Sequence, residues 1–214
     1  MRYEAVFFDL DGTVIDTLQN ITDAVNHTMR CFGLPEFTGE ALKPRLGWGA
    51  DYLMRQLHPE YPQERIAELL ACYLPYYAQH TTENTPPYPG ILPMLRQLRA
   101  RGTALALVSN KPDAAVQPLM DKYFRGLLSY AVGERQGIAR KPAPDMLRLA
   151  ADAMGVRLPR CLYVGDTEVD LQTARNTGID CVCVTWGFRT REQLQRAGAE
   201  QIADTPEELL RFVD

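Results

Sequence analysis

The stretch Val6-Phe7-Phe8-Asp9-Leu10-Asp11-Gly12-Thr13 decides how the rest of the chain is interpreted. Its first three residues are β-branched or aromatic, and the polar residues and glycine that follow predict a buried strand ending in a turn. Asp-x-Asp-Gly-Thr is expected by chance at about one in 10^5 positions, given a typical usage of about 5–7% for each residue type. Asp11-Gly12 alone is a common turn dipeptide, so its functional interpretation depends on the other strands.

Later segments of similar character alternate with helical patterns. The predicted strands are Ala104–Val108, Leu128–Val132, Cys161–Val164 and Cys181–Val184. The helical patterns between them contain Leu92, Leu95 and Leu98, then Met146, Leu147 and Ala150, then residues 169–174 before Gly178. This alternation predicts an α/β fold with a doubly wound parallel sheet and helices on both faces.

About ninety residues separate the first predicted strand from the second, whereas a crossover between parallel strands needs only a dozen or more. Two helical faces lie in this interval: Leu18, Ile21, Val25, Met29 and Phe32, then Ile66, Leu69, Leu70 and Tyr73. Pro75 should end or kink the second helix, and residues 81–87 are typical of a linker. We therefore expect a helical cap domain at 16–84, inserted into a discontinuous core of 1–15 and 85–214.

Polar residues follow the predicted strands, at the edge where open α/β sheets bind ligands. Ser109-Asn110 ends the second strand and Lys111-Pro112 opens a helix, Lys141-Pro142 starts the helix after the third, and Gly165-Asp166 precedes Asp170. Each has an ordinary explanation on its own, as a helix cap, a solvated lysine or acidic residues favoured by a helix dipole. Their joint placement at successive strand ends favours an active site.

These four segments resemble the four motifs of the haloacid dehalogenase superfamily, and the inserted helices resemble its cap. The resemblance covers essentially the whole chain. Within the superfamily, residues 8–17 and 163–167 are most similar to phosphoglycolate phosphatases and their close relatives.

Phosphoryl-transfer chemistry and this resemblance together imply a role for each residue. Asp9 is the expected nucleophile, forming an aspartyl phosphate, and Asp11 the general acid and base. Mg²⁺ would be held by the carboxylates of Asp9 and Asp166 and the backbone carbonyl of Asp11. Asp170 would orient a metal-bound water or Lys141. The residues expected to contact phosphate are Thr13, Ser109, Asn110 and Lys141.

The cap loop from Lys43 to Gly49 is the candidate for substrate specificity. It combines the cations Lys43 and Arg45 with Trp48, which is flanked by glycines. Either the tryptophan belongs to the cap core and the cations are solvated, or the loop reaches the cleft and binds an acidic leaving group. We expect a small phosphorylated metabolite, with 2-phosphoglycolate first.

Composition excludes several other classes of protein. The net charge of −4 and pI near 5.5 disfavour a nucleic-acid partner. A membrane span and a signal peptide are not expected from the sequence. The five cysteines contain no C-x-x-C pair, which disfavours a cysteine metal site. Cys181 and Cys183 would share one face of a strand, so buried thiols are expected, and a reducing cytoplasm fits best. The chain should be a monomer or homodimer.

Other functions stay open. A haloacid dehalogenase would need no acid at Asp11. A β-phosphoglucomutase-type phosphotransferase shares the catalytic set and the sequence Lys141-Pro142-Ala143-Pro144-Asp145, and an inorganic pyrophosphatase shares the fold. A phosphorelay receiver would also carry an acceptor aspartate, but the long cap argues against it.

Overall fold

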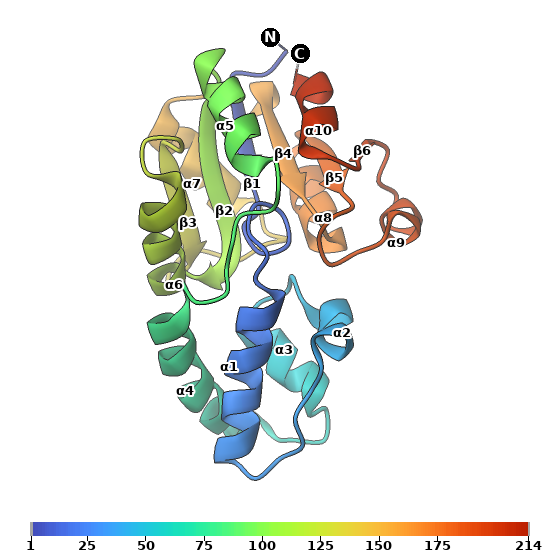
Figure 1. Ribbon diagram of the computed structural model, residues 1–214. Helices are drawn as coiled ribbons and strands as arrows, with labels where there is room; N and C mark the ends of the chain where they lie inside the picture. The colour runs from blue at the N-terminus through green and yellow to red at the C-terminus, as the bar shows by residue number, and fades with distance from the viewer. Residues whose placement is uncertain (1, 214) are drawn as a thin grey trace.

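The computed structural model describes residues 2–213 and contains one six-stranded parallel sheet (Figure 1). Its strands are β1 (Ala5–Phe8), β2 (Ala104–Pro112), β3 (Tyr130–Glu134), β4 (Cys161–Gly165), β5 (Asp180–Val184) and β6 (Ile202–Ala203). They lie in the order β3-β2-β1-β4-β5-β6, with β1 near the centre. The prediction of a parallel α/β sheet is confirmed.

Side chains of β1 alternate between two apolar layers, as successive residues of a strand must. Val6 and Phe8 pack with α5 (Ile91–Ala100) and α10 (Pro206–Val213). Ala5 and Phe7 pack with α7 (Asp145–Met154) and, beside it, α8 (Glu168–Thr177). The remaining helical elements of the core are α6 (Asp113–Leu119), η2 (Met120–Phe124), η3 (Leu158–Arg160) and α9 (Arg191–Arg196). The sheet is thus covered on both faces, as expected for parallel strands.

Two strands differ from their predicted bounds by two residues or more, and one strand was not predicted. Leu128 directly follows the turn at 125–127, and its N–H donates to Phe124 O at 3.1 Å, so β3 begins two residues later than expected. β2 continues through Lys111-Pro112, which therefore end the strand rather than open a helix. β6 has only two residues, too few to form a recognisable periodic pattern.

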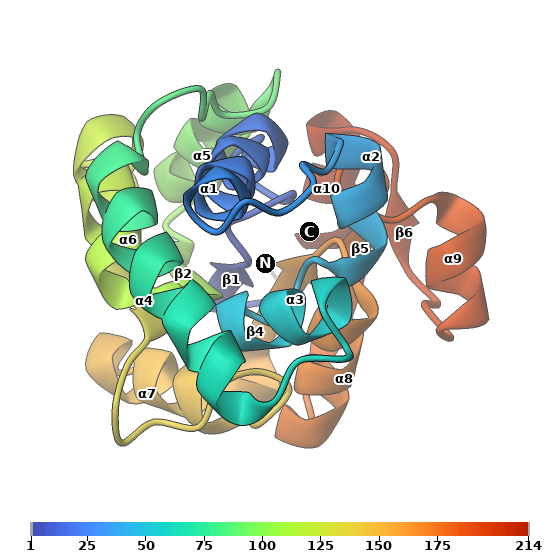
Figure 2. The ribbon, with the colours of Figure 1, turned by 90° about the horizontal axis from the view of Figure 1, so that it is seen from below.

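The helices between β1 and α5 form a group at the carboxyl end of the strands (Figures 1 and 2). They are α1 (Leu18–Cys31), α2 (Gly39–Leu42), η1 (Lys43–Arg45), α3 (Ala50–Leu57) and α4 (Gln63–His80). Ile21, Val25 and Met29 of α1 are buried in their shared core, together with Ile66 and Leu69 of α4. The first of these helices starts at Leu18 and the last ends at His80, both inside the predicted cap of 16–84. The domain boundaries themselves remain a prediction.

Pro75 does not end the helix that contains it. Two effects of this proline were predicted, an end of the helix or a kink. The prediction of an end is wrong, because α4 continues to His80. Proline in a helix interior removes one backbone hydrogen bond and crowds the preceding turn. Here Tyr73 and Tyr77 are buried on either side of the exposed Pro75, and their packing holds the helix through it.

Two chain segments connect the helical group to the sheet, and they lie side by side. Asp16 N donates to Pro86 O at 2.9 Å, and Tyr88 N donates to Val14 O at 3.2 Å. Ile15 also forms bridges with Asp11 and Pro87. The segment that leaves the core therefore passes directly beside the candidate site. Within residues 2–213, no helix has the length and apolar character that a membrane crossing requires.

Candidate active site

Adjacent parallel strands bring the predicted polar residues to one edge of the sheet. Phe8 is in register with Leu107 of β2 and Val164 of β4, so Asp9 follows between the ends of these strands. The N–H of Asp9 donates to Val164 O at 2.8 Å, which fixes its backbone at this edge. Its carboxylate is nearly buried, with 5% of the residue exposed.

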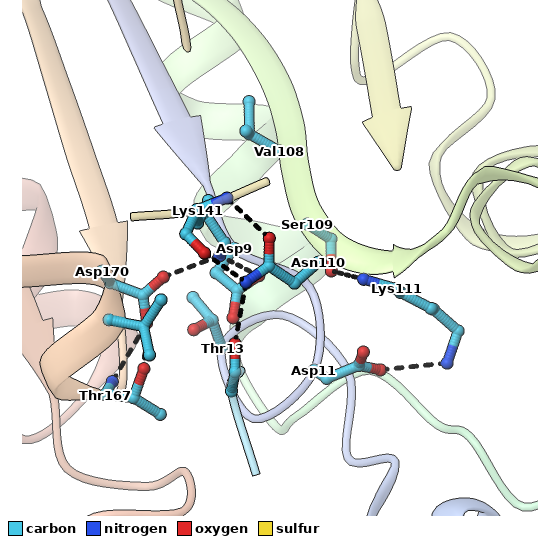
Figure 3. A network of polar contacts seen from close by, with 12 residues as sticks. Asp9, Asp11, Thr13, Val108, Ser109, Asn110, Lys111, Lys141, Thr167 and Asp170 are labelled. Carbon is cyan, nitrogen blue, oxygen red and sulfur yellow. Dashed lines mark hydrogen bonds and ion pairs between the residues drawn. The ribbon is translucent and has the colours of Figure 1, made fainter. Parts of the chain in front are cut away.

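Lys141 joins three side chains from different parts of the chain. Two of them, Asp9 and Asp170, are labelled beside it in Figure 3. The Lys141 ammonium donates to Asp9 Oδ1, Asp170 Oδ1 and the Tyr163 hydroxyl, each at 2.8 Å. Only 2% of Lys141 is exposed, so these contacts replace water almost completely. Buried charges are tolerated when they are paired and hydrogen-bonded in this way. Lys141 precedes α7 by a short loop, whereas the sequence had placed it at the start of the helix.

Asp170 has two structural duties. Its Oδ2 accepts from the backbone N–H and hydroxyl of Thr167, at 3.0 and 2.8 Å, and so caps the N-terminus of α8. Its Oδ1 holds Lys141. Asp170 is therefore both an acidic residue in the first turn of a helix, its ordinary explanation, and a residue that orients Lys141, its expected role.

Asp166 is enclosed by neighbouring backbone and by a hydroxyl. It accepts from Thr13 Oγ1 at 2.9 Å and from Phe188 N at 2.7 Å. Gly12 adopts φ +84°, and a Cβ at Gly12 or Gly187 would lie 2.4 or 2.3 Å from Asp166 Oδ2. Such contacts are impossible, so both positions require glycine to let the backbone approach the carboxylate. Thr13, expected to contact phosphate, instead directs its hydroxyl to Asp166.

The buried carboxylates carry more negative charge than the protein compensates. Burial raises the pKa of Asp9 to about 7, although the Lys141 ammonium opposes this. Burial and the neighbouring Asp170 and Asp9 raise the pKa of Asp166 well above its usual range. For Lys141, burial favours the neutral form, but Asp170 and Asp9 outweigh it and the pKa is raised. Three carboxylates surrounding one ammonium favour an additional cation.

The donor atoms suit a hard divalent cation. Carboxylate oxygens of Asp9, Asp166 and Asp170 all lie within 4.8 Å of one another. Mg²⁺ prefers oxygen ligands and is commonly bound by one or two carboxylates with waters completing its shell. Asp170 already binds Lys141 and Thr167 with both oxygens, which leaves Asp9 and Asp166 as the better placed pair.

Asp11 lies apart from this group and has its own cationic partner. Lys111 Nζ donates to Asp11 Oδ1 at 3.1 Å and also contacts the Tyr77 hydroxyl of α4. Figure 3 shows Asp11 directed towards Lys111, while Asp9 faces Lys141. Burial lowers the pKa of Lys111, although Asp11 opposes the shift. The pairing was not predicted, because nothing local in the sequence links Lys111 to Asp11.

Asn110 connects the second motif to Lys141 and to the cap loop. Its side-chain Oδ1 accepts from Lys141 N at 2.8 Å, and its Nδ2 donates to Lys141 O and Gly47 O at 3.0 and 3.1 Å. Ser109 Oγ accepts from Lys111 N at 3.2 Å. Both residues line the cleft that contains Asp9 and Asp11.

The three cap-loop candidates occupy different positions. Arg45 lines the cleft with Asp11, and one of its guanidinium nitrogens donates to Ala41 O at 2.5 Å. Lys43 pairs with the exposed Glu40 at 2.7 Å. Trp48 donates through Nε1 to Glu168 at 3.2 Å. Neither Lys43 nor Trp48 is among the residues described as lining the cleft.

Arg189, which the sequence analysis missed, ties this loop to the core. It is 6% exposed and forms a paired ion bridge with Glu168, at 2.8 and 2.9 Å. It also donates to the carbonyls of Lys43, Pro44 and Leu46 at 2.7, 3.3 and 3.0 Å. An arginine after a strand carries no local signal of such contacts.

This arrangement defines a class of hydrolase in which a helical cap stands over aspartates at the strand ends of an α/β core. A family model of the haloacid dehalogenase-like hydrolases matches residues 6–184, and the chain belongs to this family. The resemblance found in the four motifs is thereby confirmed.

The similar proteins are phosphatases. The chain is 32% identical over 212 residues to a phosphoglycolate phosphatase of Pseudomonas putida, covering 96% of this chain and 78% of that protein. It is 33% identical to one of Rhodospirillum rubrum, covering 94% and 87%. A crystal structure from Lactobacillus delbrueckii subsp. bulgaricus, provisionally named a phosphoglycolate phosphatase, matches 100% and 99% of the two chains at 38% identity and a TM-score of 0.95. The protein is therefore a phosphatase of this family, similar to the phosphoglycolate phosphatases.

Proposed function

We propose that the protein is a Mg²⁺-dependent phosphomonoester hydrolase that forms an aspartyl phosphate on Asp9. One observation supports this most strongly: the buried Asp9 carboxylate lies at the end of a central strand and Lys141 holds its Oδ1. Asp11, two residues later, lines the same cleft with a separate partner, so the two carboxylates are placed for different tasks.

The proposed reaction has two steps. The Asp9 carboxylate attacks phosphorus, the bond to the leaving oxygen breaks, and Asp11 donates a proton to that oxygen. Water then attacks the phosphorus of the acyl phosphate, Asp11 takes its proton, and inorganic phosphate leaves with Asp9 restored. Ser109 and Lys141 would contact the phosphate oxygens. Asp9, Asp166 and the Asp11 carbonyl would hold Mg²⁺, which would neutralise charge on the phosphoryl group.

Rapid-quench mass spectrometry tests the proposed nucleophile. With a phosphomonoester and Mg²⁺, phosphate should be found on the peptide containing Asp9, and Asp9→Asn should abolish both this adduct and turnover. A phosphate trapped on Ser109 instead would exclude the mechanism. Transfer to a second phosphate-bearing sugar rather than to water would favour the mutase alternative.

We propose 2-phosphoglycolate as the substrate, on two grounds. The similar proteins named above carry that substrate in their names. In the structure, Arg45 lines the same cleft as Asp9 and Asp11, where a guanidinium would pair with the substrate carboxylate through charge-assisted hydrogen bonds. Lys43 in the same loop pairs with Glu40 and provides a matched control.

Two variants and a substrate panel test this specificity. Arg45→Ala should lower kcat/KM for 2-phosphoglycolate roughly tenfold to a few hundredfold, since hydrogen bonds to charged groups contribute about 1.5–3 kcal/mol. Its effect on p-nitrophenyl phosphate, which has no carboxylate, should be small, and Lys43→Ala should change neither substrate much. Equal losses on both substrates would make Arg45 structural. Preference for pyrophosphate or β-glucose 1-phosphate would reject this substrate while leaving the phosphatase chemistry intact.

A further inference from the structure

A second cluster of possible ligands lies in the cap, apart from the catalytic cleft. His27 and Cys31 are one turn apart on α1, and Cys72 is on α4. One donor atom from each, a ring nitrogen and two sulfurs, lies within 4.8 Å of the other two. The helices α1 and α4 run beside one another (Figure 1), so chain regions some forty residues apart supply the cluster. None of the three residues lines the cleft that contains Asp9.

The spacing of the donors suits tetrahedral coordination. Zinc binds cysteine sulfur at about 2.3 Å and histidine nitrogen at about 2.0–2.1 Å, so tetrahedral geometry separates these atoms by about 3.6 Å. The observed distance between His27 Nε2 and Cys31 Sγ is 3.6 Å. The Cys72 sulfur lies within 4.8 Å of the donor atoms of the other two residues.

The neighbouring residues orient the cluster without filling it. The His27 ring stacks on Tyr76, with centroids 3.8 Å apart and planes 11° apart, so its Nε2 is held towards Cys31. Thr28 also contacts the Cys72 sulfur, which lies beside the Cys31 thiol. Cys31 is exposed, and His27 and Cys72 are partly exposed, so an ion has a direct path from solvent.

We propose that His27, Cys31 and Cys72 form a zinc site on the outer side of the cap, with solvent as the fourth ligand. Thiolates are soft ligands and imidazole also suits zinc, whereas magnesium prefers oxygen ligands. The ion joins α1 to α4, and the two thiols release their protons to solvent when it binds. Cysteine ligands were not expected from the sequence, which has no C-x-x-C pair. In the folded chain the cysteine ligands come from two different helices, α1 and α4.

A disulfide between Cys31 and Cys72 is the competing explanation. A disulfide requires an oxidant and does not involve His27. It therefore leaves unexplained why the His27 imidazole is directed at Cys31. The two explanations differ in measurable ways, since only the metal site depends on histidine and survives in a reducing buffer.

Cobalt substitution separates this site from the catalytic one. Co²⁺ bound to thiolates produces near-ultraviolet charge-transfer absorption, which the oxygen ligands at Asp9 and Asp166 do not produce. The intact reduced protein, titrated with Co²⁺, should show this band at one equivalent per chain, and Zn²⁺ should displace it.

Variants identify the ligands. His27→Gln, Cys31→Ser and Cys72→Ser should each abolish the band or weaken Zn²⁺ binding at least tenfold to a hundredfold, the loss that outer partners alone can cause. Cys161→Ser is the matched control, because its hydroxyl retains the hydrogen bond that the buried Cys161 makes to Arg157 O. Mg²⁺-dependent phosphatase activity should be unchanged in all four variants.

Three outcomes would overturn the proposal. The first is the absence of thiolate absorption in the reduced protein, and the second is a band unaffected by His27→Gln. The third is a Cys31–Cys72 disulfide, found by peptide mapping under non-reducing conditions, in protein that binds no zinc after reduction. Because each readout is spectroscopic or analytical, failure here leaves the proposed phosphatase chemistry untouched.

Discussion

Asp11 and Asp166 carry the same functional group in different surroundings. Asp11 faces Lys111 at the cleft, whereas Asp166 is fully buried and accepts from Thr13 and a backbone N–H. We predict that Asp11→Asn lowers kcat about 10²–10⁴-fold, the usual contribution of general acid–base catalysis, with little change in the Mg²⁺ requirement. Asp166→Asn should first raise the Mg²⁺ concentration needed for half activity. Activity titrated against Mg²⁺ distinguishes them, and equal losses of metal affinity would mean that the assigned roles are wrong.

The raised pKa of Asp9 has a consequence for stability. Burial raises the pKa of Asp9 in the metal-free protein to about 7, from the ordinary 3.8. The folded state therefore holds a proton that the unfolded state has lost between these values, so the contribution of Asp9 to stability falls as pH rises from about 4 to 7. The Asp9→Asn variant has no carboxylate to deprotonate, so its stability should not fall in this way. At pH 8, with a chelator to remove metal, it should unfold less readily than the parent.

Urea denaturation at pH 4 and pH 8 measures this difference. We expect the variant to gain on the order of 1–3 kcal/mol at pH 8, given about 1.4 kcal/mol per pKa unit and the loss of one Lys141 contact. The gain should shrink at pH 4, and Mg²⁺ should reduce it at pH 8 by stabilising only the parent. A variant less stable than the parent at both pH values would contradict the prediction.

At the scale of elements, the positions of the candidate site residues are largely predictable from the sequence, and their contact partners are not. Asp9, Asp166 and Ser109 follow short apolar runs, and parallel strands must end at one edge, so local patterns suffice to bring them together. Lys111 and Arg189 are different, because each meets carboxylates or carbonyls contributed by distant segments. The hydrophobic pattern of one segment carries no information about which residues of a distant segment its side chains will contact.

The continuation of α4 through Pro75 can be tested by restoring the missing hydrogen bond. Pro75 is exposed, and alanine is favoured over proline in a helix interior by about 3 kcal/mol. A more flexible unfolded chain offsets about 0.4–1 kcal/mol of this gain. Pro75→Ala should therefore raise the free energy of unfolding by about 2–3 kcal/mol in urea denaturation. Pro62→Ala, at the N-cap of the same helix, should have little effect, because no helical N–H is required there. A destabilised Pro75→Ala would indicate that Tyr73 and Tyr77 need the proline geometry.

For the whole molecule, Arg189 is the main polar link between cap loop and core. Arg189→Met should lower the free energy of unfolding by about 2–4 kcal/mol, since it removes three hydrogen bonds to carbonyls and the ion pair between the buried Arg189 and the partly exposed Glu168. It should also raise KM more than it lowers kcat, because the loop bearing Arg45 loses its anchor. Arg191→Met is the control: its pair with Asp204 is about half exposed and should contribute less than about 1 kcal/mol. Equal effects of the two substitutions would show that Arg189 does not anchor the loop.

The position of β1 also constrains how the protein folds. Ala5 pairs with Ala104 and Cys161, so the first strand synthesised cannot pair until the cap and a second strand have been made. At about 5–20 residues per second this delay lasts about 5–20 s on the ribosome. The cap helices contact one another locally and should gain hydrogen-exchange protection before β1 in pulse-labelled refolding, since non-local pairing is slow. Simultaneous protection would contradict this order. In the interval the apolar segment Ala5–Phe8 has no partner strands, which makes the nascent chain a natural client for chaperones.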